Sequence, residues 1–265
     1  MTNVIQYRDA TDTNRGPSPI IWGDCPWLEI EAQVGQGNGG YSFFDDFVNA
    51  PDHLTNVIHG AAQVGKYQVF TSDGSAAVGN VSAAGGALFM NSVESNKGAS
   101  VRTGGAAFNL ATLSKKLWFE ARVKVGSVAD TKNGVFLGLY DDTAMSATVP
   151  IAADGTLAAN TYVGFHRLEA DGDQFDLVHG DGSTATTLAA DAITLAEDTY
   201  VKVGMVFESD TITFYKDGTA LSDTLSVGAT EYPDAETVNP TIAILGAATE
   251  ATGVTLDWWR VAQLS

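Results

Sequence analysis

Residues 199–221 read TYVKVGMVFESDTITFYKDGTAL and decide the fold class. Apolar side chains fall at every second position, first over residues 201–207 and again over 211–215. This period of two is typical of antiparallel strands that turn one face to a core and the other to solvent. Ser209-Asp210 separates the two runs, and a Lys-Asp-Gly turn at 216–218 follows the second. We therefore predict antiparallel strands joined by tight turns.

The same alternation recurs along most of the chain, and no strong helical pattern competes with it. LWFEARVKV at 117–125 places five apolar residues on one face and Trp118, Glu120, Arg122 and Lys124 on the other. Asp-Gly and Asn-Gly steps supply the left-handed backbone of tight hairpins. Further strands are predicted at 135–140, 162–170, 175–178, 241–245 and 254–264, with a short helix at 51–57. The predicted fold is a single all-β, antiparallel β-sandwich over residues 41–265.

Residues 1–40 differ from the rest of the chain. Gly16-Pro17-Ser18-Pro19 disfavours regular structure, because prolines remove backbone donors and fix φ. We predict an extended N-terminal arm, tethered by a Gly-rich hinge at 35–40, that lies against neighbouring subunits or folds back on its own sandwich. The predicted partner contacts are its apolar side chains Tyr7, Ile20, Trp22, Trp27 and Leu28.

The composition argues against several function classes. The 265 residues carry 32 acidic and 14 basic side chains, for a formal charge of −18. Nucleic acid and anionic membranes would repel such a protein, so we expect neither as a partner. Cys25 is the only cysteine, which excludes an intrachain disulfide. The sequence shows no signal peptide and no run of about 18 apolar residues, so we expect synthesis in the cytoplasm.

Three segments carry a resemblance to a known family. They are LWFEARVKV at 117–125 with GVFLGLYD at 134–141, YVKVGMVFESDTITFYKDGTAL at 200–221, and VTLDWWRVAQL at 254–264. Together they resemble strands of the concanavalin A-like lectin/glucanase jelly roll, and the likeness spans residues 41–265. This resemblance implies a jelly-roll sandwich, because the matching segments encode sandwich geometry rather than chemistry.

A second resemblance concerns the start of the sandwich. The run GYSFFDDF at 40–47 opens a Gly-, Ala- and Thr-rich acidic β-domain. It is similar to tailed-phage virion proteins, some of which decorate the capsid or belong to the tail. The resemblance implies a structural subunit of a virion rather than an enzyme.

Hydrolysis of glycans needs two carboxylates on one face. Glucanases of the resembled family carry them on a Glu-x-Asp-x-Glu strand, and this sequence has no such pentad. The nearest string, Glu29-Ile30-Glu31, lies in the arm. We therefore expect no glycosidase activity and treat this class as the least supported.

Glycan binding without hydrolysis would use an exposed aromatic ring together with Asp or Asn side chains. Trp118 and Trp259 are the candidate glycan contacts. Trp258 and Trp259 are adjacent, so they face opposite sides of their strand. The alternative is that one of this pair fills the core while the other packs under a loop or the arm.

Metal and cofactor sites are not indicated. Asp171-Gly172-Asp173 and Asp141-Asp142 offer oxygen ligands for Ca²⁺, but hairpin turns and solvated loops explain them as well. The four histidines show no zinc-binding spacing. A Gly-x-Gly-x-x-Gly match at 35–40 precedes an extended run instead of a helix, so we read it as a hinge.

These observations lead to two function hypotheses. The first is a non-enzymatic virion protein, a phage capsid decoration or cement protein that attaches through its N-terminal arm to capsid or other virion proteins. A homo-oligomer such as a trimer would fit the threefold sites of a capsid lattice. The alternative is a carbohydrate-binding, lectin-like module displayed on a virion or cell exterior.

Overall fold

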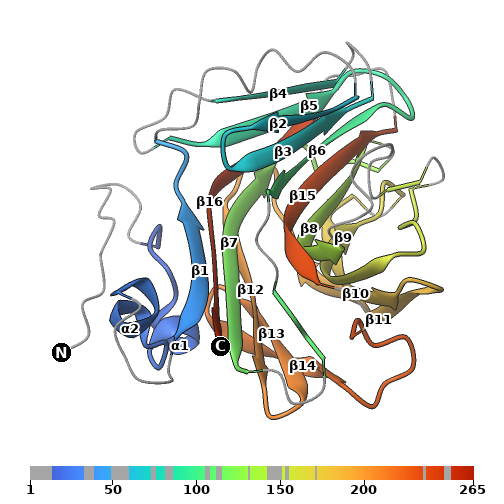
Figure 1. The fold of residues 1–265 in the computed structure, drawn as a ribbon. Helices are drawn as coiled ribbons and strands as arrows, with labels where there is room; N and C mark the ends of the chain where they lie inside the picture. Colours follow the sequence, from blue (N-terminus) through green and yellow to red (C-terminus); the bar gives the residue numbers. More distant parts are fainter. Residues whose placement is uncertain are drawn as a thin grey trace.

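Two antiparallel β-sheets face each other across a shared core in the computed structural model of the chain (Figure 1). Two short helices lie outside the sandwich, beside β1. This arrangement confirms the predicted all-β sandwich. The structure describes residues 14–32, 39–48, 60–72, 76–80, 86–104, 108–111, 115–130, 132–141, 151–152, 155–170, 172–234, 237–247 and 252–265.

The helices are α1 (Pro19–Trp22) and α2 (Trp27–Ala32). The strands are, in chain order, β1 (Gly40–Asp45), β2 (Gly60–Val64), β3 (Tyr67–Thr71), β4 (Ala76–Asn80), β5 (Leu88–Ser92), β6 (Gly98–Thr103), β7 (Leu117–Val125), β8 (Asn133–Asp141), β9 (Thr161–Arg167), β10 (Gln174–Asp181), β11 (Ala185–Thr194), β12 (Val201–Glu208), β13 (Thr211–Lys216), β14 (Thr219–Ser226), β15 (Val238–Gly246) and β16 (Thr252–Leu264). Each strand that the sequence predicted individually coincides with one of β7–β10, β12, β13, β15 and β16. Among the described residues, no helix is long and apolar enough to cross a membrane.

Sheet A has the strand order β14-β13-β12-β7-β16-β5-β4, and sheet B has the order β11-β10-β9-β8-β15-β6-β3-β2. The last strand, β16, pairs with β7 along one edge and with two shorter strands, one after the other, along its other edge. Its residues 252–256 pair with β5, whereas residues 259–264 pair with β1. The end of the chain therefore lies along the start of the sandwich, and the backbone N–H of Ser265 donates to the carbonyl of Gly39 at 2.7 Å.

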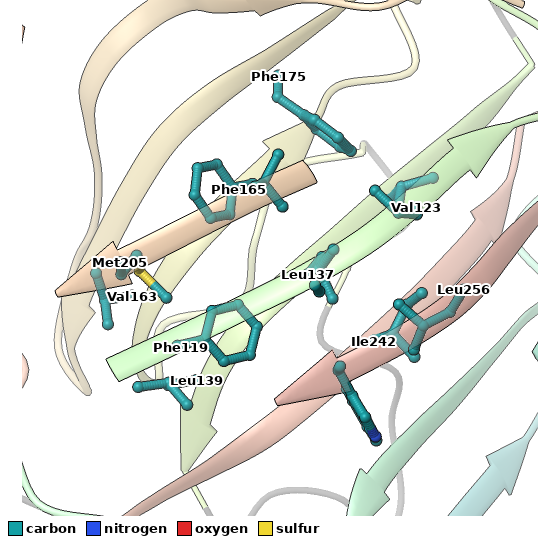
Figure 2. Close-up of a cluster of buried hydrophobic side chains, with 14 of the residues drawn as sticks. Phe119, Val123, Leu137, Leu139, Val163, Phe165, Phe175, Met205, Ile242 and Leu256 are labelled. Carbon is teal, nitrogen blue, oxygen red and sulfur yellow. The ribbon is translucent and has the colours of Figure 1, made fainter. Parts of the chain in front are cut away.

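The core lies between the inner faces of the two sheets, as Figure 2 shows. Phe119 and Met205 of sheet A meet Leu137 and Phe165 of sheet B, and each is at most 1% exposed. Along β7, for example, the core residues Leu117, Phe119, Ala121 and Val123 alternate with residues that point outward. The predicted period of two therefore correctly identifies which side chains form the core.

The outer face of sheet A differs from the prediction of a solvated face. Trp118, Glu120, Arg122 and Lys202 point away from the core, yet they are 1%, 0%, 6% and 5% exposed. They are buried because residues 14–32, which we call the N-terminal segment, pack over them. The alternation predicts two faces but carries no information on what covers the second one.

The predicted extended arm is wrong for the described part of residues 1–40, where α1 and α2 form instead. Pro19 is the first residue of α1, a position that needs no backbone N–H, so proline does not prevent the helix. Ile21, Trp22 and Ile30 are buried against sheet A, and this burial stabilises helices that are too short to persist alone. The segment folds back on its own sandwich, as the alternative interpretation expected.

The hairpin turns follow the predicted chemistry. Ser209 and Asp210 have φ of 51° and 61° between β12 and β13, and Asp217 and Gly218 have φ of 49° and 79° between β13 and β14. Two consecutive positive φ angles define the type I′ turn that suits the twist of antiparallel strands. The predicted helix at 51–57 and most of the Gly-rich hinge lie outside the described residues.

Candidate functional site

Polar side chains on the outer face of sheet A hold the N-terminal segment. We call the following set the receptor face: Trp118, Glu120, Arg122, Lys202, Asp257, Trp258 and Arg260. They come from β7, β12 and β16. A β-bulge between Leu256 and Trp258 inserts one extra residue in β16. As a result, Asp257 and Trp258 both reach the segment, although they are adjacent in sequence.

Glu120 is the buried centre of the receptor face. Its Oε2 accepts hydrogen bonds from the backbone N–H of Ser18 at 2.9 Å and from Nε1 of Trp22 at 2.8 Å. Burial raises the pKa of the Glu120 carboxyl, while the hydrogen bonds from Ser18 and Trp22 and the charge of Lys202 act in the opposite direction. This carboxylate thus anchors the segment and does not open onto a groove where it could meet a substrate.

Asp257 joins two arginines, one from each side of the interface. It accepts from Nε and Nη2 of Arg15 at 3.0 and 2.6 Å, and from Nη1 of Arg122 at 2.6 Å. Nε1 of Trp258 donates to the carbonyl of Arg15 at 2.6 Å. The Asp257 side chain is only 4% exposed, so these charges are well shielded from water. Paired, bidentate contacts of this kind fix geometry as well as charge.

Aromatic rings complete the interface. The guanidinium of Arg260 lies 3.4 Å from the ring centroid of Trp27 and 4.6 Å from that of Trp22. Nε1 of Trp118 donates to Oδ1 of Asp24 at 3.0 Å. Four of the five tryptophans in the chain therefore contact the segment or belong to it, and the fifth, Trp259, lies in the core.

A polar pocket of about 310 Å³ opens where the N-terminal segment meets β7 and β12. Its lining residues are Asn14, Arg122, Asp198, Thr199, Tyr200, Lys202 and Asp217. The floor is cationic and buried, because Arg122 and Lys202 are 6% and 5% exposed. Asn14, Asp198 and Asp217 are exposed and form the rim.

The pocket is held in shape by the contacts of its own lining. The Arg122 guanidinium lies 3.9 Å from the ring centroid of Tyr200, and Nζ of Lys202 donates to the carbonyl of Gly16 at 3.1 Å. Oδ1 of Asp217 accepts from the backbone N–H of Lys202 at 3.0 Å. One aromatic ring, the Asp217 carboxylate and two cations are thereby fixed around one small space.

The two predicted glycan contacts are wrong, because neither ring is accessible. Trp259 is 0% exposed and packs in the core beside Phe43, Phe47 and Tyr67, with ring centroids 6.1–6.2 Å apart. Trp118 is 1% exposed and lies beneath the N-terminal segment. The alternative interpretation of the adjacent tryptophans is confirmed, since Trp259 fills the core and Trp258 packs under the segment.

The predicted partner contacts of the arm fall into two groups. Trp22 is 9% exposed and Trp27 is half-buried, and both pack against the protein's own receptor face. Trp22 is therefore unavailable to a neighbouring subunit while the segment is docked. Ile20 and Leu28 are each 68% exposed. Tyr7 lies outside the described residues.

Other candidate chemistry does not assemble in the described part of the chain. Within it, no group of three or more His, Cys, Asp or Glu side chains is placed to hold a metal ion. Asp173 is exposed in the turn before β10, and Asp141 is buried at the end of β8. Asp142 and Asp171, which completed the two predicted acidic pairs, lie outside the described residues.

Comparison with known proteins defines the fold class. No protein-family model and no curated protein sequence matches the chain. Peanut lectin is 10% identical, with a TM-score of 0.54 over 85% of this chain and 98% of the lectin chain. A GH16 protein from the Bacteroides ovatus mixed-linkage glucan locus is 12% identical, with a TM-score of 0.54 over 83% and 99%. The Emp47p carbohydrate recognition domain is 13% identical, with a TM-score of 0.51 over 84% and 95%.

The chain thus has the antiparallel sandwich of the concanavalin A-like lectins and glucanases, which the sequence resemblance implied. At these identities the likeness shows the fold alone. Lectins and glycan-degrading enzymes share that fold, so activity has to be argued from side chains.

The pocket residues were missed by the sequence prediction. Asp198-Thr199-Tyr200 and Asp217-Gly218 were read only as the edges of two strands and a turn. The signal was present, because Tyr200 precedes β12 by one residue and Asp217 lies in the turn that follows β13. Antiparallel pairing of β12 with β13 brings these two sites to the same end of the sheet.

Proposed function

We propose that this protein is a non-catalytic, lectin-like carbohydrate-binding module whose glycan contact is the polar pocket beside the N-terminal segment. The observation that carries the proposal is the composition of that pocket. Asp198, Asp217 and Asn14 offer oxygen acceptors to sugar hydroxyls, and the Tyr200 ring offers a partly exposed aromatic surface. A volume of about 310 Å³ lies at the lower end of the usual range of about 300–1,000 Å³, which suits a single sugar unit.

Hydrolysis is not part of the proposal. A glycosidase needs one carboxyl group that stays protonated until it donates to the leaving oxygen, and burial is what keeps such a group neutral. Asp198 and Asp217 are exposed on the rim, and Asp198 pairs with Nζ of Lys124 at 3.1 Å. Both carboxylates are placed on the rim where they can accept hydrogen bonds from sugar hydroxyls.

A glycan array with the full-length protein, followed by calorimetry on the best ligand, tests the proposal. We expect Tyr200→Ala to weaken binding by about tenfold. Nucleic-acid bases lose roughly 1–3 kcal/mol of binding when an aromatic platform is replaced by alanine, and we expect a loss at the lower end of this range for a sugar ring. Tyr41→Ala is the matched control, since Tyr41 is 61% exposed on β1 and does not line the pocket. No binding on the array, or equal affinities for both variants, would contradict the proposal.

A second candidate function is favoured by the two exposed apolar residues of the segment. Ile20 and Leu28 could attach the protein to a virion, as a capsid decoration protein would require, and removing them costs the fold little. The virion location, the capsid partner and a trimeric state stay predictions. Binding of the purified protein to particles, compared with an Ile20→Ser/Leu28→Ser variant, tests them; equal binding of both would count against this candidate.

A further inference from the structure

The N-terminal segment binds the receptor face with side-chain contacts, as a separate ligand would. Hydrogen bonds run from Arg15 to Asp257, and from Ser18 and Trp22 to Glu120. Both acceptors belong to strands of sheet A, and the described part of the segment adds no strand to that sheet. The receptor face is therefore complete within the sandwich, whichever chain supplies the segment.

The receptor face is shaped for this segment in both charge and volume. Glu120 and Asp257 are 0% and 3% exposed with the segment in place. An empty face would remove both donors of Glu120 Oε2 and the Arg15 contact of Asp257, which keeps its hydrogen bond from Arg122. Gly204 provides the seat for Ile21, because a Cβ atom at Gly204 would lie 2.7 Å from Cδ1 of Ile21. An unoccupied receptor face thus loses these contacts and uncovers the rings of Trp118 and Trp258, so docking of a segment is favoured.

The sequence between segment and sandwich is short and contains two glycines. Six residues, Gln33-Val34-Gly35-Gln36-Gly37-Asn38, join α2 to the residue before β1. Six residues span up to about 20 Å when extended, and glycine imposes few backbone restrictions on the path. The helices have four and six residues, too few to persist in water, so the segment needs a receptor face in order to fold.

We propose that the receptor face also accepts the N-terminal segment of a second copy of this chain, so that two copies exchange segments reciprocally. The second copy is the occupant because it carries the one sequence known to match all of these contacts. Reciprocal exchange fills both faces and preserves every contact, so the balance between monomer and exchanged dimer depends on the connection and on concentration. Each pocket would then include Asn14 from the other copy, although the exchange itself does not rest on the proposed function.

Complementation between two full-length variants tests the exchange. Gly204→Val blocks the seat of Ile21 but keeps an intact segment, whereas Arg15→Ala/Trp22→Ala damages the segment but keeps an intact receptor face. We expect native mass spectrometry of the mixture to show a mixed dimer, at twice the chain mass of 27.8 kDa and several-fold more abundant than dimers of either variant alone. Salt at about 0.15 M screens the repulsion between two acidic chains beyond about 8 Å.

In the control experiment, Leu28→Ser replaces the Arg15→Ala/Trp22→Ala variant in the mixture. Leu28 is exposed, so the segment of this control variant still docks on its own chain. It should give no enrichment of the mixed species. Should either variant fail to fold, wild-type chains carrying two different mass tags provide the second measurement. We expect them to form mixed dimers on concentration, and we expect those dimers to disappear when both chains carry Arg15→Ala/Trp22→Ala. A mixture that stays monomeric, or dimers that survive the loss of Arg15 and Trp22, would overturn the proposal.

Discussion

Glu120 and Trp22 form the link on which docking of the N-terminal segment depends. An indole ring supplies both a large apolar surface and one hydrogen-bond donor, which suits an apolar site that contains a buried carboxylate. The Nε1 of Trp22 lies 2.8 Å from Oε2 of Glu120, and the ring packs beside Trp27 at a centroid distance of 5.5 Å. This hydrogen bond thus ties the aromatic cluster to the buried carboxylate, in addition to the contacts of Arg15 and Asp24 with the receptor face.

Replacing Trp22 with Phe tests the polar half of this link. The substitution keeps an aromatic ring but leaves a fully buried carboxylate with one donor fewer, so we expect a loss of about 1–3 kcal/mol in the free energy of unfolding. Urea denaturation followed by circular dichroism measures it. Leu28→Ala on the exposed side of the segment should change that free energy by less than about 0.5 kcal/mol. Equal effects of the two substitutions would show that the hydrogen bond is unimportant.

The protonation of Glu120 predicts a pH dependence. Burial raises the pKa of this carboxyl above its ordinary value of 4.5. The folded protein therefore holds the proton more tightly than the unfolded chain does. The resulting stabilisation is fully present below about pH 4.5 and is lost as the pH rises through the pKa of the folded state.

Glu120→Gln removes this titration while keeping a similar shape. Between pH 4.5 and 8, we expect the wild-type protein to lose stability relative to the Gln variant as the pH rises. Parallel urea titrations at several pH values provide the comparison. A difference that stays constant, or that changes in the opposite direction, would refute the assignment of a raised pKa.

The turn of the β13–β14 hairpin, at the edge of sheet A, lies against the N-terminal segment. Gly218 has a φ of 79° in its turn, and a Cβ atom there would lie 3.1 Å from Cβ and Oγ of Ser18. The turn therefore requires glycine for two reasons, the left-handed backbone and the close approach of Ser18. Residues that shape a hairpin thus also position the segment that covers the sheet.

Gly218→Ala should destabilise the protein by about 1–2 kcal/mol, the cost of a left-handed backbone for an L-residue. Thermal unfolding measures the change. Gly228→Ala is the matched control, because a Cβ atom there would meet only Oγ of Ser226 at 3.9 Å and its backbone is not left-handed. If both alanines lower the midpoint equally, the turn geometry is not the cause.

The sandwich as a whole is covered on the outer face of sheet A, where a solvated surface was expected. A chain shortened to residues 39–265 would uncover Trp118, Trp258 and Glu120, which are at most 2% exposed in the intact protein. We expect a lower midpoint of thermal unfolding and stronger binding of a hydrophobic dye than for the full chain. An unchanged midpoint would mean that the segment adds nothing to stability.

The sequence predicted those parts of the fold that depend on local alternation and turn chemistry. LWFEARVKV reads correctly as β7, and Ser209-Asp210 reads correctly as a turn. It did not predict that Glu120 and Arg122 are buried, because alternation cannot show what covers a face. The helices of the segment span four and six residues, which is too short for a helical period to be detected. The pocket was missed because Tyr200 and Asp217 meet only through the pairing of β12 and β13.

The pairing of the last residues of β16 with the start of β1 has a consequence for protein engineering. Because Ser265 donates to Gly39 across 2.7 Å, the sandwich can be rewired so that residue 265 runs directly into residue 39. Opening such a circularly permuted chain at the exposed Gly182-Ser183 turn would retain all of the strand pairings and release residues 14–32 as an independent peptide. The affinity of the receptor face for the N-terminal segment would then become directly measurable.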